Sequence, residues 1–513
     1  MMLKSLQKYI LPGFCIGILF LFMIAICRIN FSFEPSHYST DMYTDMRYAL
    51  QAWEKKSIFP EGWVFGNQLY AVATPVLSAF FYGICGSMNL SMGLASTVMG
   101  IFVIFSFCWL LRAFIPRFRG QLLAITLFMT ASLIFGGPFR ETNGWQLFFT
   151  MSSFYACYAI CAFLAFGCYI RGKWEKKQLF PLILCVFLSF GTGLQSLRQT
   201  LIMALPIMAV ELLCILYRVY HKQALFTFRT VVAAVVFVSN LLGVVTAKLL
   251  QIPQVEIFGK ITITGLQTPI LSLQQSFANA LSLVGLGNKS PALILAIMAI
   301  FGILCLAYRL QENAESGSLC LLLLTVSLVG VLMLDAFTTM HIRSIYYFLL
   351  YPLLGTVGAV LYSHFGKWVR YGACLLLVVS LLSGAEEKLQ PVFEPTSSPD
   401  RYDAVVAYLE EQGIDTVYSG WNRGERIGIA SDGRIRCGFW DAPKTPFVPV
   451  KYLCDPEVFD AEPENCAYVF LNSSEANTAI EAAKEKGTKL KLLKHFPEVS
   501  IYIYIADVNL IGK

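Results

Sequence analysis

The sequence predicts a mainly α-helical, polytopic membrane protein of about eleven transmembrane helices, followed by an extracytoplasmic α/β domain. Of its 513 residues, 56% are hydrophobic and only 14% are charged, whereas a soluble domain carries about 25% charged residues. The charge is also divided along the chain. Residues 1–386 hold 25 basic and 13 acidic residues, and residues 387–513 hold 14 basic and 20 acidic residues. We therefore expect a transmembrane domain at 1–386 and a polar domain at 387–513.

The same composition excludes several classes of protein. A soluble enzyme, a disordered chain and a disulfide-knit secreted module would all be less apolar. The net charge of +6 combines a cationic membrane part with an acidic tail, so it reflects the basic loops of a membrane protein. No nucleic-acid partner is expected, and membrane lipids are.

The helix count rests on apolar runs near the length that crosses a bilayer, about 20 residues. A further run, 70–87, contains Thr74 and Pro75 and is predicted to lie at the outer interface or to dip into it. The eleven predicted spans are 10–28, 91–111, 121–137, 147–170, 179–195, 200–217, 230–249, 290–308, 318–338, 346–363 and 371–385.

Basic residues set the orientation, because cytoplasmic loops of membrane proteins are enriched in lysine and arginine. Lys4 and Lys8 predict a cytoplasmic N-terminus, and Arg112, Arg117 and Arg119 predict that the next strongly basic loop is cytoplasmic too. One crossing between these points gives 15 basic residues in cytoplasmic loops and eight in outer loops. Eleven spans then put the C-terminal domain outside the cell membrane.

Two long loops, 29–90 and 250–289, fall on the outer side in this topology. The cytoplasmic loops are short. A protein with two large loops and a domain on one side is expected to work on that side. The 250–289 loop is a candidate cover for the site.

The polar tail reads as an α/β domain with alternating helices and strands. A hairpin turn is predicted at Ser431–Arg434. Cys437, Cys454 and Cys466 are either free thiols or include one bridge, 454–466. Helices are predicted at 401–412 and 474–486, and strands at 415–419, 466–471, 489–494 and 499–505.

Asp41 and Asp45 in the first outer loop are the leading candidates for chemistry. Their spacing of i, i+4 puts both carboxylates on one face of a helix. Two such acids could bind a divalent cation, or act as a general base with an orienting neighbour. The alternative is a solvated helix face, or pairing with Arg47. A divalent cation held by Asp41 and Asp45 is the only cofactor that the sequence suggests.

The segment around these acids resembles a motif of the polyprenyl-phosphate-sugar-dependent membrane glycosyltransferases of the GT-C fold. It is similar in style to the protein O-mannosyltransferases and the aminoarabinose lipid A transferases. In these, an Asp-Glu-x-Arg-Tyr-Ala-like stretch supplies the catalytic acid, and a Lys/His-Pro-Pro-Leu stretch follows. The matching residues are Thr44-Asp45-Met46-Arg47-Tyr48-Ala49 and Ala73-Thr74-Pro75-Val76-Leu77.

Two departures from the family pattern bear on the site. The adjacent acid pair is replaced by the spaced Asp41 and Asp45, which leaves open which of the two is catalytic. The basic residue before the prolines is absent. The resemblance implies a GT-C-like transmembrane domain, Asp45 as the acceptor-activating acid with Asp41 beside it, and Arg47 as a substrate-binding residue.

A transferase of this kind also needs cations that hold the donor phosphate. Arg198 lies where two spans meet at the outer face, and His341 and Arg343 lie at another outer junction. The run from Arg343 through Tyr346 to Pro352 resembles a stretch common before a late GT-C helix, so Tyr346 joins the predicted substrate site. The alternative for each arginine is an anchor among lipid headgroups.

Two acids fall inside predicted spans, where an ionisable residue suggests function. Asp335 lies near the outer end of its span and is a candidate to line the same cavity. Glu211 lies nearer the inner half, and a structural hydrogen bond to a neighbouring helix is the preferred account of it.

Three functions compete for this pattern. The first is an inverting transfer of a sugar from a polyprenyl-phosphate donor to a glycan, lipid or protein acceptor on the outer face. The second is a non-enzymatic transporter or flippase of lipid-linked glycans, which would carry charges along a central path and broken helices at mid-membrane. The third, a membrane scaffold with a sensory domain, explains the tail but not the acid pair. Charges at outer helix ends favour the transferase.

Overall fold

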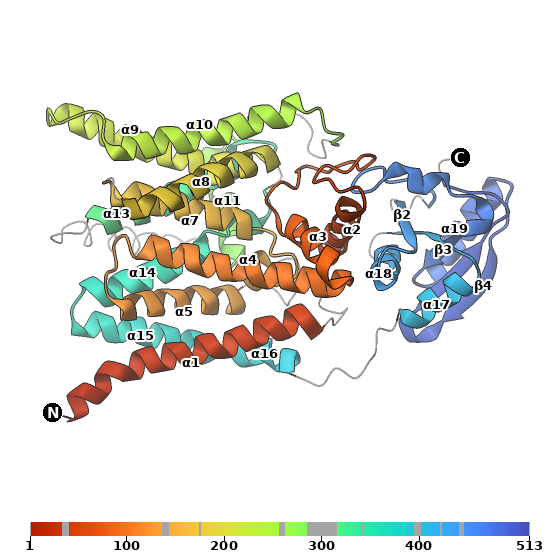
Figure 1. Cartoon of the computed structure of the whole chain (residues 1–513), viewed down its shortest axis with the longest axis horizontal. Helices are drawn as coiled ribbons and strands as arrows, with labels where there is room; N and C mark the ends of the chain where they lie inside the picture. Colours follow the sequence, from red (N-terminus) through yellow and green to blue (C-terminus); the bar gives the residue numbers. More distant parts are fainter. Residues whose placement is uncertain are drawn as a thin grey trace.

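The protein consists of a helical bundle with an α/β domain beyond one end (Figure 1). The N-terminus lies at the far end of the bundle, and the C-terminus belongs to the α/β domain. This arrangement follows from a computed structural model. It describes residues 2–32, 40–135, 143–173, 176–255, 262–284, 315–340, 342–382, 384–393, 402–420, 423–440 and 446–511.

Long apolar helices form the bundle, which confirms the polytopic membrane fold. Within the described residues, seven helices are long and apolar enough to cross a membrane, and three more apolar helices are shorter. Ten of the eleven predicted spans correspond to bundle helices, and the remaining one, 290–308, lies outside the described residues. The helices are α1 Met2–Ser32, α4 Met88–Leu111, α5 Phe118–Ile134, α7 Ala156–Arg171, α8 Lys176–Gln195, α9 Leu205–Tyr220, α10 Phe228–Leu249, α13 Glu315–Phe337, α14 Leu350–His364 and α15 Lys367–Leu382.

One predicted span is broken. The run 147–170 was expected to be continuous, but α6 (Gly144–Phe148) ends before α7 begins. Between them, Met151, Ser152 and Ser153 have φ angles of 49°, 71° and 45°. A right-handed helix cannot pass through left-handed residues, so the prediction of one unbroken span was wrong.

The predicted second outer loop contains an amphipathic helix, α11 (Pro269–Ser282), which packs against α13 and the short helix η3 (Ser344–Tyr347). At the other edge of the bundle, α16 (Ala385–Phe393) packs against α1, α5 and α15. The predicted domain boundary at 386/387 falls inside α16.

Helices α2 (Thr40–Glu54) and α3 (Thr74–Cys85) lie between the bundle and the α/β domain (Figure 1). Pro75 stands in the first turn of α3, and Gly86 ends the helix with a φ of 67°, a conformation that favours glycine. With 12 residues, α3 is too short to cross a bilayer. The 70–87 run therefore forms a short helix at the end of the bundle.

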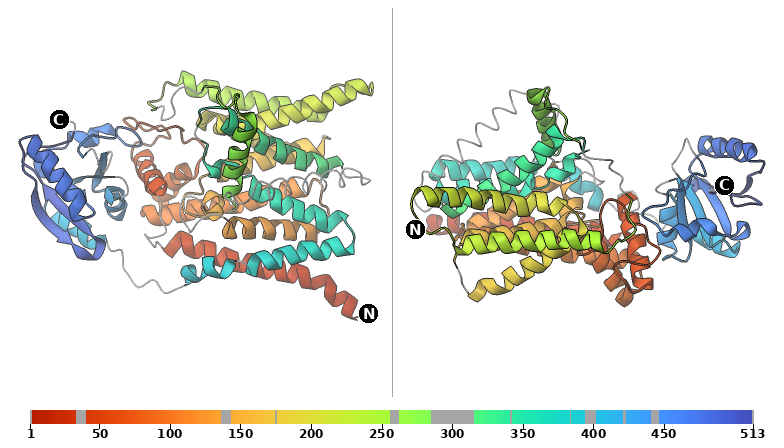
Figure 2. Two further views of the ribbon diagram at one scale, coloured as in Figure 1. Left: turned by 180° about the vertical axis from the view of Figure 1, so that it is seen from behind. Right: turned by 90° about the horizontal axis from the view of Figure 1, so that it is seen from above.

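The C-terminal domain contains a five-stranded mixed sheet with strand order β2-β1-β3-β5-β4, which confirms the α/β prediction. Strands β1, β2 and β3 are parallel, and β5 runs antiparallel to both β3 and β4. Figure 2 shows this sheet and its helices as a unit beside α2. The elements are α17 Asp403–Glu411, β1 Thr416–Gly420, α18 Arg423–Ala430, β2 Arg436–Trp440, β3 Cys466–Phe470, α19 Ser473–Glu485, β4 Lys491–Phe496 and β5 Ile501–Ile505.

The hairpin predicted at Ser431–Arg434 was wrong. The chain before it forms α18, and β2 pairs in parallel with β1 rather than antiparallel with a strand across a tight turn. Asp432 and Gly433 do have positive φ, 49° and 84°, but here they end a helix, because the Gly433 N–H donates to the Gly428 carbonyl at 2.8 Å. Left-handed residues serve helix ends as well as hairpins. The tail cysteines, Cys437, Cys454 and Cys466, are free and buried, as the free-thiol alternative predicted.

Candidate active site

Helix α2 carries both predicted acids, but in different surroundings. Asp41 stands in the first turn and is exposed, whereas Asp45, one turn later, is only 4% exposed. An acid in the first turn suits the positive end of the helix dipole. A buried carboxylate instead needs hydrogen bonds to offset the loss of water. The structure therefore distinguishes the two acids that the sequence left open.

The hydroxyl groups of Tyr70 and Ser152 lie close enough to the Asp45 carboxyl group to act on its pKa. Burial raises the pKa of Asp45 to about 8, the charges of Asp41 and Glu425 add to the rise, and the two hydroxyl groups oppose it. A carboxyl group with a pKa near the working pH can both accept and release a proton. Asp45 thus has the surroundings of a general base.

Ser152 reaches Asp45 from the left-handed turn that separates α6 from α7. The turn is buried, and its backbone is tied to α1 and α4. The Met151 N–H donates to the Asn30 side chain at 3.4 Å, and the Ser152 N–H donates to the Ser96 hydroxyl at 3.1 Å. Left-handed non-glycine residues cost of order 1–2 kcal/mol each, and such strain gathers at functional sites.

Arg198 and Tyr346, from different predicted outer junctions, come together. The Arg198 guanidinium donates to the Tyr346 hydroxyl at 3.1 Å and to the Gln68 side-chain oxygen at 3.1 Å, and it lies 4.7 Å from the centre of the Tyr346 ring. Arg343 immediately precedes η3, and its carbonyl accepts a hydrogen bond from the Tyr346 N–H at 3.0 Å. A short π-helix, η2 (Thr200–Ala204), begins two residues after Arg198, and π-helical turns are frequent at functional sites. This region gathers two cations and three tyrosines, Tyr155, Tyr158 and Tyr346.

Two chain segments link the Arg198 region to Asp45. Gln68 contacts Arg198 while Tyr70, two residues later, contacts Asp45. Likewise Ser152 contacts Asp45 while the Tyr155 ring centre lies 5.8 Å from the Arg198 guanidinium. Two and three extended residues span at most about 7 and 11 Å. The backbone of these two segments therefore connects the residues around Arg198 with the residues around Asp45.

The Arg47 side chain contacts the C-terminal domain. Its guanidinium donates to the Cys437 carbonyl at 2.9 Å, lies 3.5 Å from the Glu425 carboxylate and sits over the Phe439 ring at 4.4 Å. Its predicted contact with substrate stays a prediction.

Two predictions remain, the contact of His341 with substrate and the metal ion at Asp41 and Asp45. His341 lies outside the described residues. Among the described residues, no group of three or more histidine, cysteine, aspartate or glutamate side chains is arranged to hold a metal. Asp41 and Asp45 lack a third protein ligand of these types there, so the described residues do not make a complete metal site.

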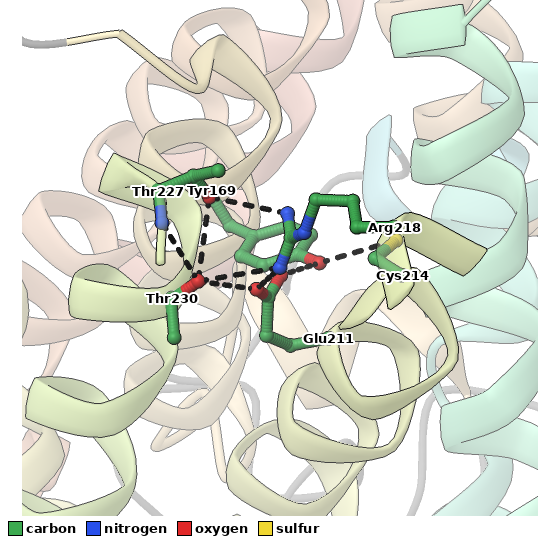
Figure 3. Close-up of polar contacts among 6 residues, drawn as sticks. All are labelled: Tyr169, Glu211, Cys214, Arg218, Thr227 and Thr230. Carbon is green, nitrogen blue, oxygen red and sulfur yellow. Dashed lines mark hydrogen bonds and ion pairs between the residues drawn. The ribbon is translucent and has the colours of Figure 1, made fainter. Parts of the chain in front are cut away.

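The two acids inside predicted spans have structural partners. The Asp335 carboxylate accepts hydrogen bonds from Asn279 at 2.8 Å and from Tyr347 at 2.9 Å. Figure 3 shows Glu211 in a separate polar cluster, where it accepts from Tyr169 at 2.7 Å and from Thr230 at 2.6 Å and pairs with Arg218. These bonds join α9 to α7 and α10, as the structural account of Glu211 predicted.

Five residues of this region were not foreseen: Gln68, Tyr70, Ser152, Tyr155 and Glu425. For Ser152 a signal existed, because Met151-Ser152-Ser153 interrupts an apolar run with polar residues. For the others the sequence offers none, since their partners lie far away along the chain.

The fold is similar to solved structures over nearly the whole chain. ArnT from Cupriavidus metallidurans in the apo state matches with a TM-score of 0.54 and 10% identity, over 98% of this chain and 99% of that chain. ArnT bound to undecaprenyl phosphate matches with a TM-score of 0.51 at the same identity and coverage. The oligosaccharyltransferase of Archaeoglobus fulgidus, in complex with Zn and sulfate, matches less well, with a TM-score of 0.42 and 12% identity over 91% of this chain and 69% of that chain. No protein-family model and no curated protein sequence matches the chain.

Proposed function

We propose that this chain, which has the GT-C fold of ArnT, is a membrane glycosyltransferase that takes its sugar from a polyprenyl-phosphate donor. The crystal structure of ArnT with undecaprenyl phosphate supports a lipid carrier of this class. The acceptor would be a glycan, lipid or protein at the cell surface. The expected orientation, with the C-terminal domain outside the cell, rests on the basic loops.

One observation carries the proposal: a buried acid and a half-buried cation cluster are joined by two short segments. Gln68 and Tyr70 link Arg198 to Asp45 from one side, and Ser152 and Tyr155 link them from the other. Sugar transfer from a lipid phosphate needs both of these elements within one site. A base must reach the acceptor while a cation holds the leaving phosphate.

In the proposed reaction, Arg198 and Arg343 hold the phosphate of the sugar donor. The Tyr346 hydroxyl donates a further hydrogen bond to this phosphate. A guanidinium suits this task because its parallel N–H groups match two phosphate oxygens. Arg198 would exchange its bonds to Gln68 and Tyr346 for bonds to phosphate. His341, which follows α13 in the sequence, is proposed as a further contact.

Asp45 acts in this scheme as the general base and Asp41 as its neighbour. Asp45 removes a proton from the acceptor hydroxyl or amine as that group attacks the sugar C1, and the phosphate leaves with its electron pair. One carboxylate acting as base leaves no enzyme nucleophile for a covalent intermediate, so the configuration at C1 inverts. No step of this scheme involves a metal ion.

The proposal is tested with purified full-length protein in lipid nanodiscs. A panel of undecaprenyl-phosphate-linked sugars, radiolabelled in the sugar, is incubated with cell-envelope acceptor fractions. We expect one sugar to move to an acceptor with release of undecaprenyl phosphate, and excess undecaprenyl phosphate to inhibit. Transfer that needs a nucleotide sugar instead would contradict the proposal.

A further inference from the structure

The C-terminal domain inserts one acid into the interface with α2. Glu425 of α18 is fully buried, and α18 packs directly against α2. Fully buried glutamates are rare unless they are paired. The position of Glu425 therefore calls for a specific role beyond packing.

The partners of Glu425 flank Asp45 along α2. The Thr44 hydroxyl donates to Glu425 Oε1 at 2.7 Å, and the Arg47 guanidinium lies 3.5 Å from the same oxygen. Thr44 precedes Asp45 directly, and Arg47 follows it by two positions. One carboxylate thus fixes the helix on both sides of the candidate base.

The second oxygen of Glu425, Oε2, is buried and has no hydrogen-bond partner. Burial raises the pKa of Glu425 to about 7, against the lowering effects of Arg47 and Thr44. An incompletely paired buried carboxylate costs stability. If Glu425 served only for packing, an apolar side chain in its place would remove this cost and make the protein more stable.

We propose that Glu425 is a positioning residue that the C-terminal domain contributes to the α2 site: it fixes the segment around Asp45 and places a negative charge beside that carboxyl group. The proposal deepens the proposed function, because it assigns to the domain a part in activating the base. Asp45 itself remains the residue that touches the acceptor.

The charged and titratable groups around the pair come from several elements. Asp45 is faced by Asp41 and Tyr48 of α2, by Tyr70, and by Glu425. Glu425 is faced by Arg47, Asp41 and Asp45 of α2 and by Cys437 of β2. Of the acids, Asp41 lies on the same helix as Asp45. Glu425 is the one supplied from the other domain.

The test measures the protonation of Asp45 without requiring transfer. Dicyclohexylcarbodiimide reacts with protonated carboxyl groups in apolar surroundings, and mass spectrometry of the α2 peptide reports labelling of Asp45. The full-length protein in nanodiscs is labelled between pH 5 and pH 10 as wild type, Glu425→Gln and Glu410→Gln. Glu410 is the matched control, since it pairs with Arg434 on the exposed surface of the same domain. Asp45→Asn identifies background.

Glutamine keeps an oxygen for Thr44 but removes the charge. We expect the labelling midpoint of Asp45 in Glu425→Gln to fall by roughly 0.3–0.5 pH unit, with Glu410→Gln at the wild-type midpoint. In the transfer assay, Glu425→Ala should lower kcat by about 10²-fold, because the segment around Asp45 is no longer held.

An unchanged midpoint in Glu425→Gln overturns the proposal, even if the variant is less stable, because loss of stability alone marks a structural role. This outcome leaves the transferase assignment intact. Wild-type transfer by Asp45→Asn would instead overturn the assignment of the base, whatever the midpoints.

Discussion

Thr44 in the first helix after α1 donates a 2.7 Å hydrogen bond to Glu425, which follows it by 381 residues. This bond is one of several that hold the C-terminal domain on α2 and the loop after it. Gln51 donates to Asp455 at 3.2 Å, and the backbone of Val64 pairs with that of Cys454. Because Asp45 adjoins Thr44, contacts that hold the domain also hold the candidate base.

Arg198→Ala should weaken binding of undecaprenyl phosphate roughly 10- to 100-fold, because a charged hydrogen bond to phosphate contributes about 1.5–3 kcal/mol. Arg198→Lys should restore only part of this, since lysine lacks the two-pronged geometry. Binding is measured with purified protein and fluorescent undecaprenyl phosphate. Arg112→Ala, an exposed arginine just after the far end of α4, is the control. Equal affinity in Arg198→Ala and Arg112→Ala would remove Arg198 from the phosphate site.

Ser152→Ala should move the acid limb of the pH–activity profile upward by roughly 0.5–1 pH unit, because the Ser152 hydroxyl lowers the pKa of Asp45. Ser153→Gly is the matched control. It keeps the Ser152 hydroxyl and suits a φ of 45°, so its profile should match wild type. A shift in Ser153→Gly but none in Ser152→Ala would show that the backbone of the turn matters, not the hydroxyl.

Stability should fall as the pH rises from about 4 to 8. Folding raises the pKa of Asp45 from 3.8 to about 8 and that of Glu425 from 4.5 to about 7. Between these values the folded state binds more protons than the unfolded state, so stability is lost with rising pH. Asp45→Asn should therefore raise Tm by several degrees at pH 8.5 and by less at pH 6.

Thermal unfolding in detergent checks this, with Asp507→Asn as an exposed-acid control. A gain for Asp45→Asn that is equal at both pH values would argue against an ionisation effect.

The topology predicts opposite accessibility for two exposed lysines. Lys484→Cys in α19 should react with a membrane-impermeant maleimide on intact cells, and Lys176→Cys at the start of α8 should react only after lysis. The parent protein gives the background from native cysteines. Labelling of Lys176→Cys in intact cells would reverse the scheme.

Apolar runs of membrane-spanning length, separated by basic loops, predicted most of the bundle helices. Each such helix can be recognised from its own residues alone. Alternation and flanking glycines likewise predicted most strands of the tail. Helix α18 was not predicted, because its sequence, RGERIGIA, is short and contains two glycines, which disfavour helix formation. The break at Met151–Ser153 was not predicted, because the hydrophobicity of a segment does not reveal its backbone conformation.

The site was predictable where a motif was local and not where it was assembled by folding. Asp41, Asp45 and the two arginines were predicted from spacing and from charge at helix ends, and their roles stay predictions. The spacing could not say that Asp41 is exposed and Asp45 buried, because burial depends on the packing around Tyr70 and Ser152. Contacts such as Arg198 with Gln68, separated by 130 residues, leave no trace in the local sequence.

The central claim is that Asp45 is the base for sugar transfer, and the most direct test compares Asp45→Asn with Asp41→Asn. Transfer of radiolabelled sugar from the polyprenyl-phosphate donor is measured in both variants, alongside binding of undecaprenyl phosphate. Asp45→Asn should lose about 10²–10⁴-fold in rate while still binding undecaprenyl phosphate, and Asp41→Asn should lose less. Wild-type transfer by Asp45→Asn, with Asp41→Asn inactive, would exchange the two roles, and wild-type transfer by both would contradict the mechanism.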